Sequence, residues 1–258
     1  MASGQKRFRL ARYHPSAELG FFVEHYWTVE WDLTGQADHQ QESLPHPSVH
    51  VAVERGRFEV VGVVEGRFVR VLQGMGRVFG VKFWPGGFYP FFGGPVSELT
   101  NRVVSLADVF GEAGKVFGKA VTACADDERN VELAEALLRA RRPVRDENVV
   151  VVREIVDQIT ADPGMTKVDD LAPVVDMSKR TLQRLFRRYV GVSAKWVIQR
   201  YRLHEAIEEI GRGRPVDWAR LAIDLGYFDQ AHFIKDFKRF AGRTPHEYAR
   251  GLGNRKPD

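Results

Sequence analysis

Two groups of side chains near the end of the sequence are suited to hydrogen bonding with DNA base edges. The first group is Arg180, Gln183 and Arg184. Arginine can hold guanine O6 and N7 in a bidentate pair, and glutamine can do the same for adenine N6 and N7. Neighbouring cations are expected to meet phosphates, which position a protein without reading sequence. The second base-edge group is Gln230, His232 and Lys235, and the expected phosphate contacts are Lys179, Arg187, Arg188, Lys238 and Arg239.

Each group falls on the second helix of a helix-turn-helix pattern. The first unit runs from Val168 to Tyr189 and the second from Val216 to Phe240, and Ser178 and Asp229 are the helix-capping residues after the turns. Spacings of three and four place the apolar residues on one face, so the polar groups point outward. A single helix of this kind could be merely solvated, but two copies of the plan argue against coincidence. The apolar faces comprise Leu182, Leu185, Phe186 and Tyr189 in the first unit, and Phe233, Phe237 and Phe240 in the second.

A single helix is predicted between the two units, from Ala194 to Ile210. At 1.5 Å per residue it would span about 25 Å and act as a rigid spacer. One turn of DNA is about 34 Å, so such a connector could present both units to successive major grooves. The second unit has an acid at its helix cap and Ala231 among the exposed residues of its second helix, so it offers fewer strong base contacts. We therefore expect a binding site with one well-defined half and one degenerate half.

The segment from about Val149 to Arg250 resembles the DNA-binding domain of the AraC/XylS family of bacterial transcription regulators. The resemblance rests chiefly on Leu171-Ala172, 178–186, Gly191, 223–227, Phe233, 237–238 and 242–250. It implies a double helix-turn-helix joined by a long helix, double-stranded promoter DNA and RNA polymerase as partners, and no enzyme activity or cofactor. It also implies base contacts at the two groups named above and at Ala231, although Asp229 replaces the serine usual at that cap.

The first half of the chain is rich in strand-like runs of valine and phenylalanine, separated by glycine-containing turns. Most members of the family carry a ligand-responsive or dimerising domain there, often a small cupin-type β-barrel, and residues 80–99 resemble an N-terminal domain of some members. A small-molecule effector and a homodimer are therefore both open alternatives. The strands are predicted at His50–Val53, Phe58–Val63, Phe68–Leu72 and Val78–Phe83, and helices at Ala17–Trp27, Ser105–Cys124 and Asn130–Arg141.

These patterns predict an α+β protein with two domains. Residues 1–143 would form a small antiparallel, cupin-like β-barrel with flanking helices, and residues 144–258 an all-α DNA-binding domain, with the boundary in the polar segment Arg142–Asn148. The charge is divided in the same way. From Gly164 onward there are 19 Lys+Arg against 12 Asp+Glu, a balance of +7, whereas the preceding residues have 19 against 22, a balance of −3. This asymmetry favours a phosphate-facing C-terminal part over a merely solvated basic surface.

Other functional classes find little support in the sequence. There is no apolar run long enough for a membrane span and no signal-peptide pattern, so we expect a cytoplasmic protein without a membrane partner. The single cysteine, Cys124, is expected to be a buried helical residue. An enzyme on the barrel is disfavoured because GxSxG, HExxH and a phosphate-binding glycine loop are all missing, while a dimerisation module without a ligand stays open.

Two groups of residues in the first half, one aromatic and one of histidines, are considered as a ligand pocket and a metal site. The aromatic group Trp84, Phe88, Tyr89 and Phe91 could line an apolar ligand pocket, although packing of the barrel against its helices is favoured. A metal site at His39, His46 and His50 is disfavoured, because His46 lies between two prolines and no HxH spacing occurs. We therefore expect no metal.

Overall fold

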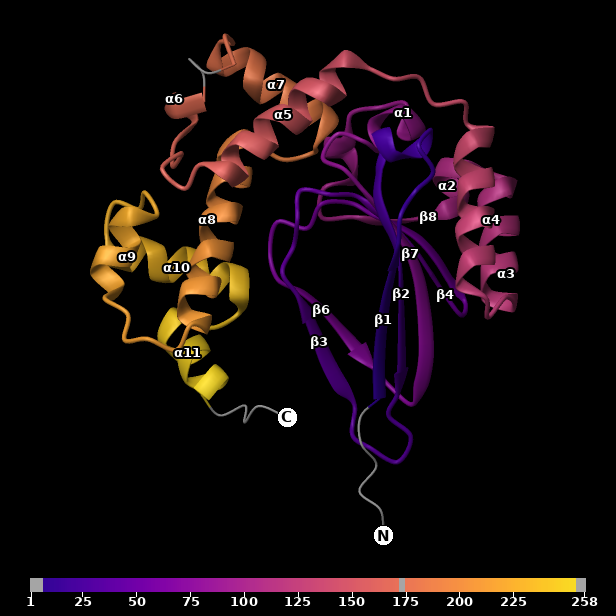
Figure 1. Cartoon of the computed structure of the whole chain (residues 1–258), viewed down its shortest axis with the longest axis horizontal. Coiled ribbons are helices and arrows are strands. Elements are labelled where there is room, and N and C mark those ends of the chain that lie inside the picture. Colours follow the sequence, from indigo (N-terminus) through magenta and orange to yellow (C-terminus); the bar gives the residue numbers. More distant parts are fainter. Residues whose placement is uncertain (1–6, 172–174, 254–258) are drawn as a thin grey trace.

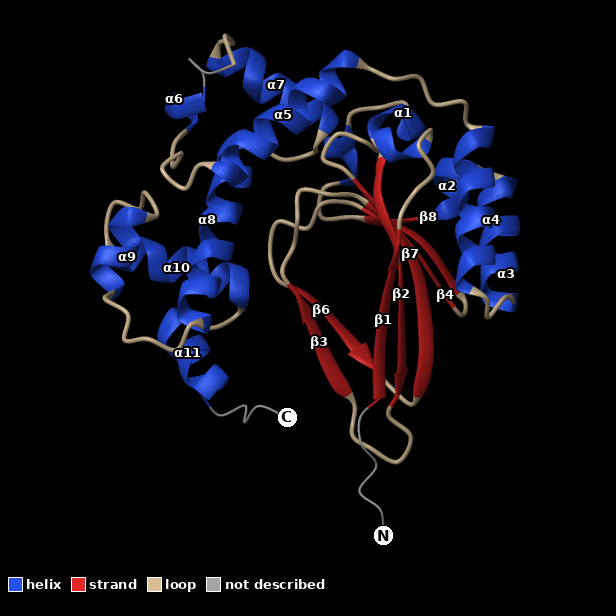
Figure 2. Cartoon of the chain, viewed as in Figure 1, coloured by secondary structure: helices blue, strands red, loops and turns tan. Residues whose placement is uncertain are grey.

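The structure, a computed structural model, describes residues 7–171 and 175–253 of the chain. The predicted first helix of the first helix-turn-helix unit, 168–174, lies partly outside the described residues. Antiparallel strands and a few helices make up the N-terminal half, and the C-terminal half is helical (Figure 2). The predicted α+β fold class is confirmed.

The N-terminal half contains two antiparallel sheets. Its strands are β1 (Arg7–Tyr13), β2 (Val23–Asp32), β3 (His39–Ser43), β4 (His50–Glu54), β5 (Arg57–Val61), β6 (Phe68–Leu72), β7 (Met75–Phe83) and β8 (Val103–Ser105). Six of them form one sheet in the order β1-β2-β7-β4-β5-β8, and β3 pairs with β6 in a second sheet (Figure 1). Within the described residues the edge strands β1 and β8 do not pair with each other. The predicted barrel is therefore not closed by one continuous sheet.

Tryptophan rings lying on glycines define one face of the large sheet. Trp27 pairs with Gly80 and Trp31 with Gly76 across strands β2 and β7. A Cβ atom added to either glycine would lie 2.1 Å from the opposing indole ring. Only glycine leaves room for this approach. Trp31 packs in a cluster that includes Leu72 of β6, so this cluster joins the two sheets.

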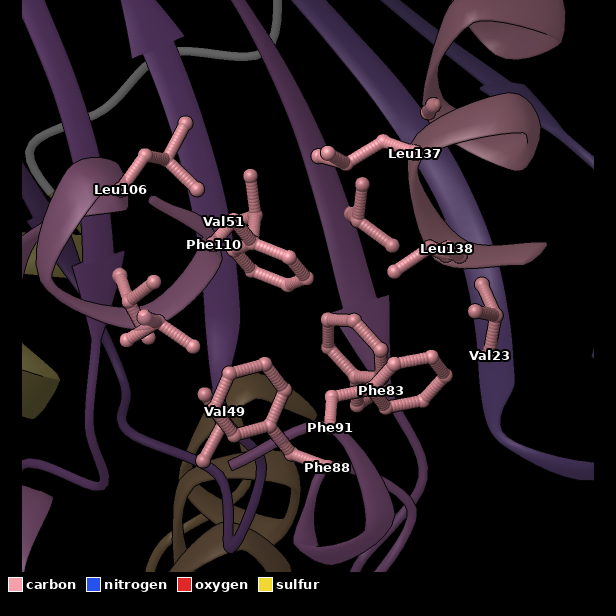
Figure 3. Close-up of a cluster of buried hydrophobic side chains, with 14 of the residues drawn as sticks. Val23, Val49, Val51, Phe83, Phe88, Phe91, Leu106, Phe110, Leu137 and Leu138 are labelled. Carbon is pink, nitrogen blue, oxygen red and sulfur yellow. The ribbon is translucent and has the colours of Figure 1, made fainter. Parts of the chain in front are cut away.

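Helices cover the other face of the large sheet (Figure 1). They are α1 (Tyr89–Phe92), α2 (Leu106–Phe110), α3 (Glu112–Ala123) and α4 (Asp127–Ala140). The core between sheet and helices is aromatic, and Phe83, Phe88 and Phe91 meet there beside leucines of α4 (Figure 3). Because this core uses side chains of strands and helices alike, it fixes the helices to the sheet.

Several predictions in this half are wrong. The predicted helix Ala17–Trp27 is a short 3-10 turn followed by strand β2. Strand β2 buries side chains on both faces, which hides the alternation typical of a strand. The predicted helix Ser105–Cys124 is broken between α2 and α3 at Gly111, whose φ of +65° favours glycine. Cys124 lies half-buried just after α3 rather than buried within a helix.

The C-terminal half consists of helices packed around one long helix. They are α5 (Glu147–Ala161), α6 (Val168–Leu171), α7 (Lys179–Tyr189), α8 (Ala194–Gly211), α9 (Trp218–Asp224), α10 (Gln230–Ala241) and α11 (Pro245–Gly253). The first part of α8 packs in a core with α5 and α7, and its later part packs with α9 and α10. The predicted connector Ala194–Ile210 is confirmed as α8 to within one residue, and α7, α9 and α10 fall in the two predicted units, ending within one residue of them. Helix α11 was not predicted.

Candidate nucleic-acid interface

Helix α7 exposes its polar residues because its apolar side chains are buried on the opposite face. The Ser178 side chain caps the helix by accepting a hydrogen bond from the Thr181 backbone N–H at 3.1 Å. Leu182 and Phe186 are fully buried in the core shared with α5 and α8. This places three predicted base-contact residues on the surface, Arg180, Gln183 and Arg184. Among the described residues, neither arginine forms an ion pair, so both guanidinium groups can accept a new partner.

Helix α10 follows the same plan in the second unit. The Asp229 side chain accepts a hydrogen bond from the His232 backbone N–H at 2.7 Å and so caps the helix. Phe233 and Phe237 are fully buried against α8 and α9. Gly226, with φ of +78°, forms the turn before the cap. The predicted base-contact residues of this unit are exposed: Gln230, Ala231, His232 and Lys235.

Exposed cations flank both polar groups, but some of them already have acidic neighbours. The Lys179 ammonium lies 2.5 Å from a carboxylate oxygen of Asp169 on α6. An Arg239 guanidinium nitrogen lies 3.0 Å from an Asp236 carboxylate oxygen. A phosphate contact by either cation would have to replace or share that carboxylate. The predicted phosphate-contact residues Arg187 and Lys238 form no ion pair within residues 7–171 and 175–253.

The connector α8 is a continuous helix of 18 residues, which corresponds to about 27 Å. Arg202 in its middle is almost completely buried. Its guanidinium donates hydrogen bonds to the Ile159 carbonyl and, at 3.2 Å, to the Asp162 carbonyl at the end of α5. Burial lowers the pKa of Arg202 from its usual value. The arginine therefore satisfies carbonyls that α5 leaves open at its C-terminus, and it ties α5 to the connector.

The end of α7 also contacts the N-terminal half of the chain. The Arg188 Nε donates a hydrogen bond to the Tyr89 hydroxyl at 2.8 Å. The rings of Tyr89 and Tyr189 lie with centroids 4.2 Å apart. Just beyond α7, the Thr100 hydroxyl donates to the Gly191 carbonyl at 2.7 Å. Arg188, a predicted phosphate contact, is thus held by the N-terminal half, and the hydrogen bond to Tyr89 raises its pKa.

A separate contact joins the N-terminal half to the second unit. Glu42 on β3 lies 3.4 Å from an Arg243 guanidinium nitrogen, just after α10. The His46 and His204 rings are stacked with centroids 4.8 Å apart. Burial lowers the pKa of His204 to about 4, and the nearby positive charge of Arg200 acts in the same direction. His204 is therefore neutral near pH 7. No local sequence signal indicated either of these contacts.

The aromatic residues named as a candidate ligand pocket have packing contacts. Phe88 and Phe91 are buried in the core between the large sheet and its helices. The Arg153 guanidinium of α5 lies 4.6 Å from the centroid of the Trp84 ring, and Tyr89 contacts α7 as described. The structure thus brings Trp84 and Tyr89 to the junction of the two halves, whereas Phe88 and Phe91 belong to the core of the N-terminal half.

The three histidines considered for a metal are dispersed. His39 lies beside Phe8 with ring centroids 5.2 Å apart, His46 stacks on His204, and His50 lies 6.3 Å from Trp27 between centroids. Within the described residues, no group of three or more histidine, cysteine or carboxylate side chains is placed to hold a metal ion. No described helix combines the length and apolar character needed to cross a bilayer.

Three further residues near the polar groups were not singled out in the sequence. Lys167, Lys195 and Phe228 line a cleft between the two units. Phe228 is 90% exposed. An apolar residue in a polar turn, away from the buried face of α10, is the signal that could have identified it.

Comparison with known families places a known domain over each half. Residues 171–251 match a helix-turn-helix domain, and residues 11–105 match a domain of unknown function (DUF6597). The first of these matches spans α7 to α10 with both polar groups. The predicted AraC-type helix-turn-helix domain is thereby confirmed.

Individual proteins that resemble this chain have low sequence identity to it. An uncharacterized HTH-type transcriptional regulator of Haemophilus influenzae is 27% identical over 85 residues, which is 33% of this chain and 28% of that protein. The crystal structure of ToxT from Vibrio cholerae O395 aligns with a TM-score of 0.41 and 10% identity, covering 97% of this chain and 99% of that one. Wild-type ToxT of Vibrio cholerae strain SCE256 with bound unsaturated fatty acid aligns over all of both chains, with a TM-score of 0.38 and 10% identity.

Proposed function

We propose that the protein is a sequence-specific transcriptional regulator that binds double-stranded promoter DNA through both helix-turn-helix units. One observation carries the proposal: two capped helices, α7 and α10, expose polar residues while their apolar faces are buried against a single helix, α8. Exposed arginine and glutamine at the start of such a helix are the donors and acceptors that distinguish base pairs in the major groove. The family match to a helix-turn-helix domain supports the same function.

The connector suits binding in two adjacent grooves. Helix α8 measures about 27 Å and one helical turn of DNA is about 34 Å, so two units anchored along α8 are spaced on the scale of successive major grooves. Arg180, Gln183 and Arg184 would contact bases from α7, and the four exposed residues named above would do so from α10. The flanking cations would contact phosphates, which add affinity but little specificity.

We further propose that residues 1–143 and 144–258 are two domains and that the first controls the second. The largest core of the N-terminal half draws its residues from 19–138, and the cores around α8 lie within 149–241 apart from Val63. Contacts such as Tyr89 with Arg188 join them directly. A small-molecule effector or a second copy of the chain, acting on the N-terminal domain, would change how these contacts hold the DNA-binding domain.

The remaining partners follow from this function. A promoter-binding regulator acts on RNA polymerase, and in a bacterium it would do so in the cytoplasm. We propose that the protein works by binding rather than catalysis. A ligand in an apolar pocket around Trp84, Phe88, Tyr89 and Phe91 is part of the proposal, with thermal-shift screening of the full chain as its test. A compound that raises the melting temperature and loses this effect in Phe91→Ala would support the pocket, whereas an unchanged effect would exclude it.

A competition mobility-shift assay tests the central proposal. The full chain would be incubated with labelled fragments of its own upstream region and challenged with unlabelled specific or random DNA. We expect specific DNA to compete more strongly than random DNA at the same salt concentration, because typical specificity ratios are roughly a thousandfold or more. Equal competition by both DNAs would contradict the proposal.

A further inference from the structure

A cleft of about 380 Å³ lies between the two helix-turn-helix units, beside the start of α10. One wall comes from the segment that leads into α6, and the opposite wall from the turn between α9 and α10. The floor is helix α8. Its lining includes Lys167, Asp169, Lys195, Gln199, Phe228 and His232.

The cleft is continuous with the polar residues on both sides. His232, in the first turn of α10, forms part of one wall. Asp169, in the other wall, is the partner of Lys179, the first residue of α7. The cleft therefore has a residue of α10 in one wall and the ion-pair partner of the first residue of α7 in the other.

The charge of the cleft favours a polyanion. Lys167 and Lys195 are exposed, and within the described part of the chain neither ammonium group has an ion-pair partner. The one acidic side chain in the named lining, Asp169, is neutralised by Lys179 at 2.5 Å. Lys167 in one wall and Lys195 on the floor are therefore both available to negative groups spaced along a backbone.

Phe228 gives the cleft an apolar edge. Its side chain is 90% exposed, whereas Phe233 and Phe237 of the same unit are fully buried. A phenylalanine exposed to this extent contributes little to the folded core, so its ring is available to a partner. A deoxyribose ring offers an apolar face next to phosphates, which matches a phenylalanine next to lysines.

We propose that the cleft holds the stretch of DNA sugar–phosphate backbone that lies between the two major grooves. Lys167 and Lys195 contact phosphates, and Phe228 packs against deoxyribose. The inference rests on the proposed DNA-binding function and adds a third contact region, separate from the two recognition helices. The sugar–phosphate backbone presents no base edges to the cleft, so this contact adds affinity equally for all sequences.

The test uses full-length protein and a duplex enriched by wild-type protein from a random pool, with a scrambled duplex for comparison. Equilibrium affinity is measured by fluorescence anisotropy over a range of salt concentrations. Lys195→Ala is compared with Lys119→Ala, an exposed lysine on α3 without an ion pair among the described residues. Phe228→Ala is compared with Ile223→Ala, which alters another exposed apolar residue of the second unit that does not line the cleft.

We expect Lys195→Ala to weaken binding to both duplexes alike and to reduce the slope of log affinity against log salt by about 1. Phe228→Ala should weaken both by roughly three- to tenfold, because it removes an apolar contact. The two control variants should bind as the wild type does. Neutral methylphosphonate links placed between the two half-sites should remove the effect of Lys195→Ala, since its phosphate partner is gone.

The outcomes separate this inference from the proposed function. If Arg184→Ala loses specificity while the Lys195 and Phe228 variants bind as the wild type does, the cleft is not a backbone site and the function stands. If the selection yields no preferred duplex, the proposed function itself fails. If the Lys195 and Phe228 variants lose only the response to an added small molecule or acidic peptide, the cleft has that occupant instead and the inference is wrong.

Discussion

The two helix-turn-helix units are built alike but differ in the groups they expose. Each recognition helix is capped by a side chain one residue before it begins, Ser178 or Asp229, and each is fixed by fully buried aromatic residues. At the predicted base-contact positions the first unit exposes two arginines and a glutamine, whereas the second exposes glutamine, alanine, histidine and lysine and has an acid at its cap. The difference lies on the exposed face of each helix, where we propose that bases are read, whereas the buried face that fixes the fold is apolar in both.

The units also differ in how the N-terminal half holds them. The first unit is held at the end of α7, where Tyr89 accepts a hydrogen bond from Arg188, a residue expected to meet DNA. The second unit is held behind its recognition helix, through Glu42 and the stacked His46–His204 pair. In the first contact, Tyr89 would therefore compete directly with DNA phosphate for Arg188. The second contact would instead control where the second unit lies.

Deleting one buried aromatic ring from each unit should have the largest effect. We expect Phe186→Ala and Phe237→Ala each to lower the free energy of unfolding by about 3–5 kcal/mol, because each leaves a cavity in a fully packed core. Urea unfolding followed by circular dichroism would measure this. A loss below about 1 kcal/mol for either variant would show that its unit is not packed as described.

Base recognition should be affected more in the first unit than in the second. Arg184→Ala is expected to cost about 1–3 kcal/mol at one base position and to relax the preference there. His232→Ala should cost less, since its unit presents fewer bidentate groups. Competition binding with duplexes changed one base pair at a time would compare the two variants, and a larger specificity loss for His232→Ala would reverse the assignment.

Removing the Tyr89 hydroxyl should strengthen DNA binding modestly. Tyr89→Phe leaves Arg188 without its hydrogen-bond acceptor, so the guanidinium is free for phosphate. One hydrogen bond contributes about 0.5–1.5 kcal/mol net, which corresponds to an affinity gain of up to roughly tenfold. The double variant Tyr89→Phe with Arg188→Ala is the control and should lose the gain. Unchanged or weaker binding by Tyr89→Phe would exclude this form of control.

The second contact should also make the stability of the protein depend on pH. Burial lowers the pKa of His204 to about 4, below its unfolded value of about 6.5, so the unfolded state binds the proton more readily. The stability from this group is fully present above about pH 6.5 and is lost as the pH falls toward 4. Urea midpoints at several pH values would measure it, with His204→Gln as the control. Identical pH profiles for both proteins would contradict the assignment.

Sequence patterns identified the recognition helices because their signals are local. Buried residues recur every three or four positions in α7 and α10, and a capping side chain marks each start. The same rule failed at β2, where both faces of the strand are buried and the pattern imitates a helix.

The contacts between the two halves could not be predicted in this way. Tyr89 and Tyr189 are 100 positions apart in the sequence, and nothing in either segment specifies the other. The exposed polar residues of α7 and α10 could be predicted because helix periodicity alone indicates which face of each helix is exposed to solvent. The cleft between the units requires three separate segments to meet, so it emerges only from the tertiary structure.

Selection of duplexes from a random pool by the full-length protein tests the central claim most directly, namely that two unequal units read one site together. We expect an enriched sequence with one well-defined half and one degenerate half, spaced by about one helical turn of 10–10.5 base pairs. Two equally defined halves would contradict the inequality of the units. The absence of any enriched sequence would contradict sequence-specific binding altogether.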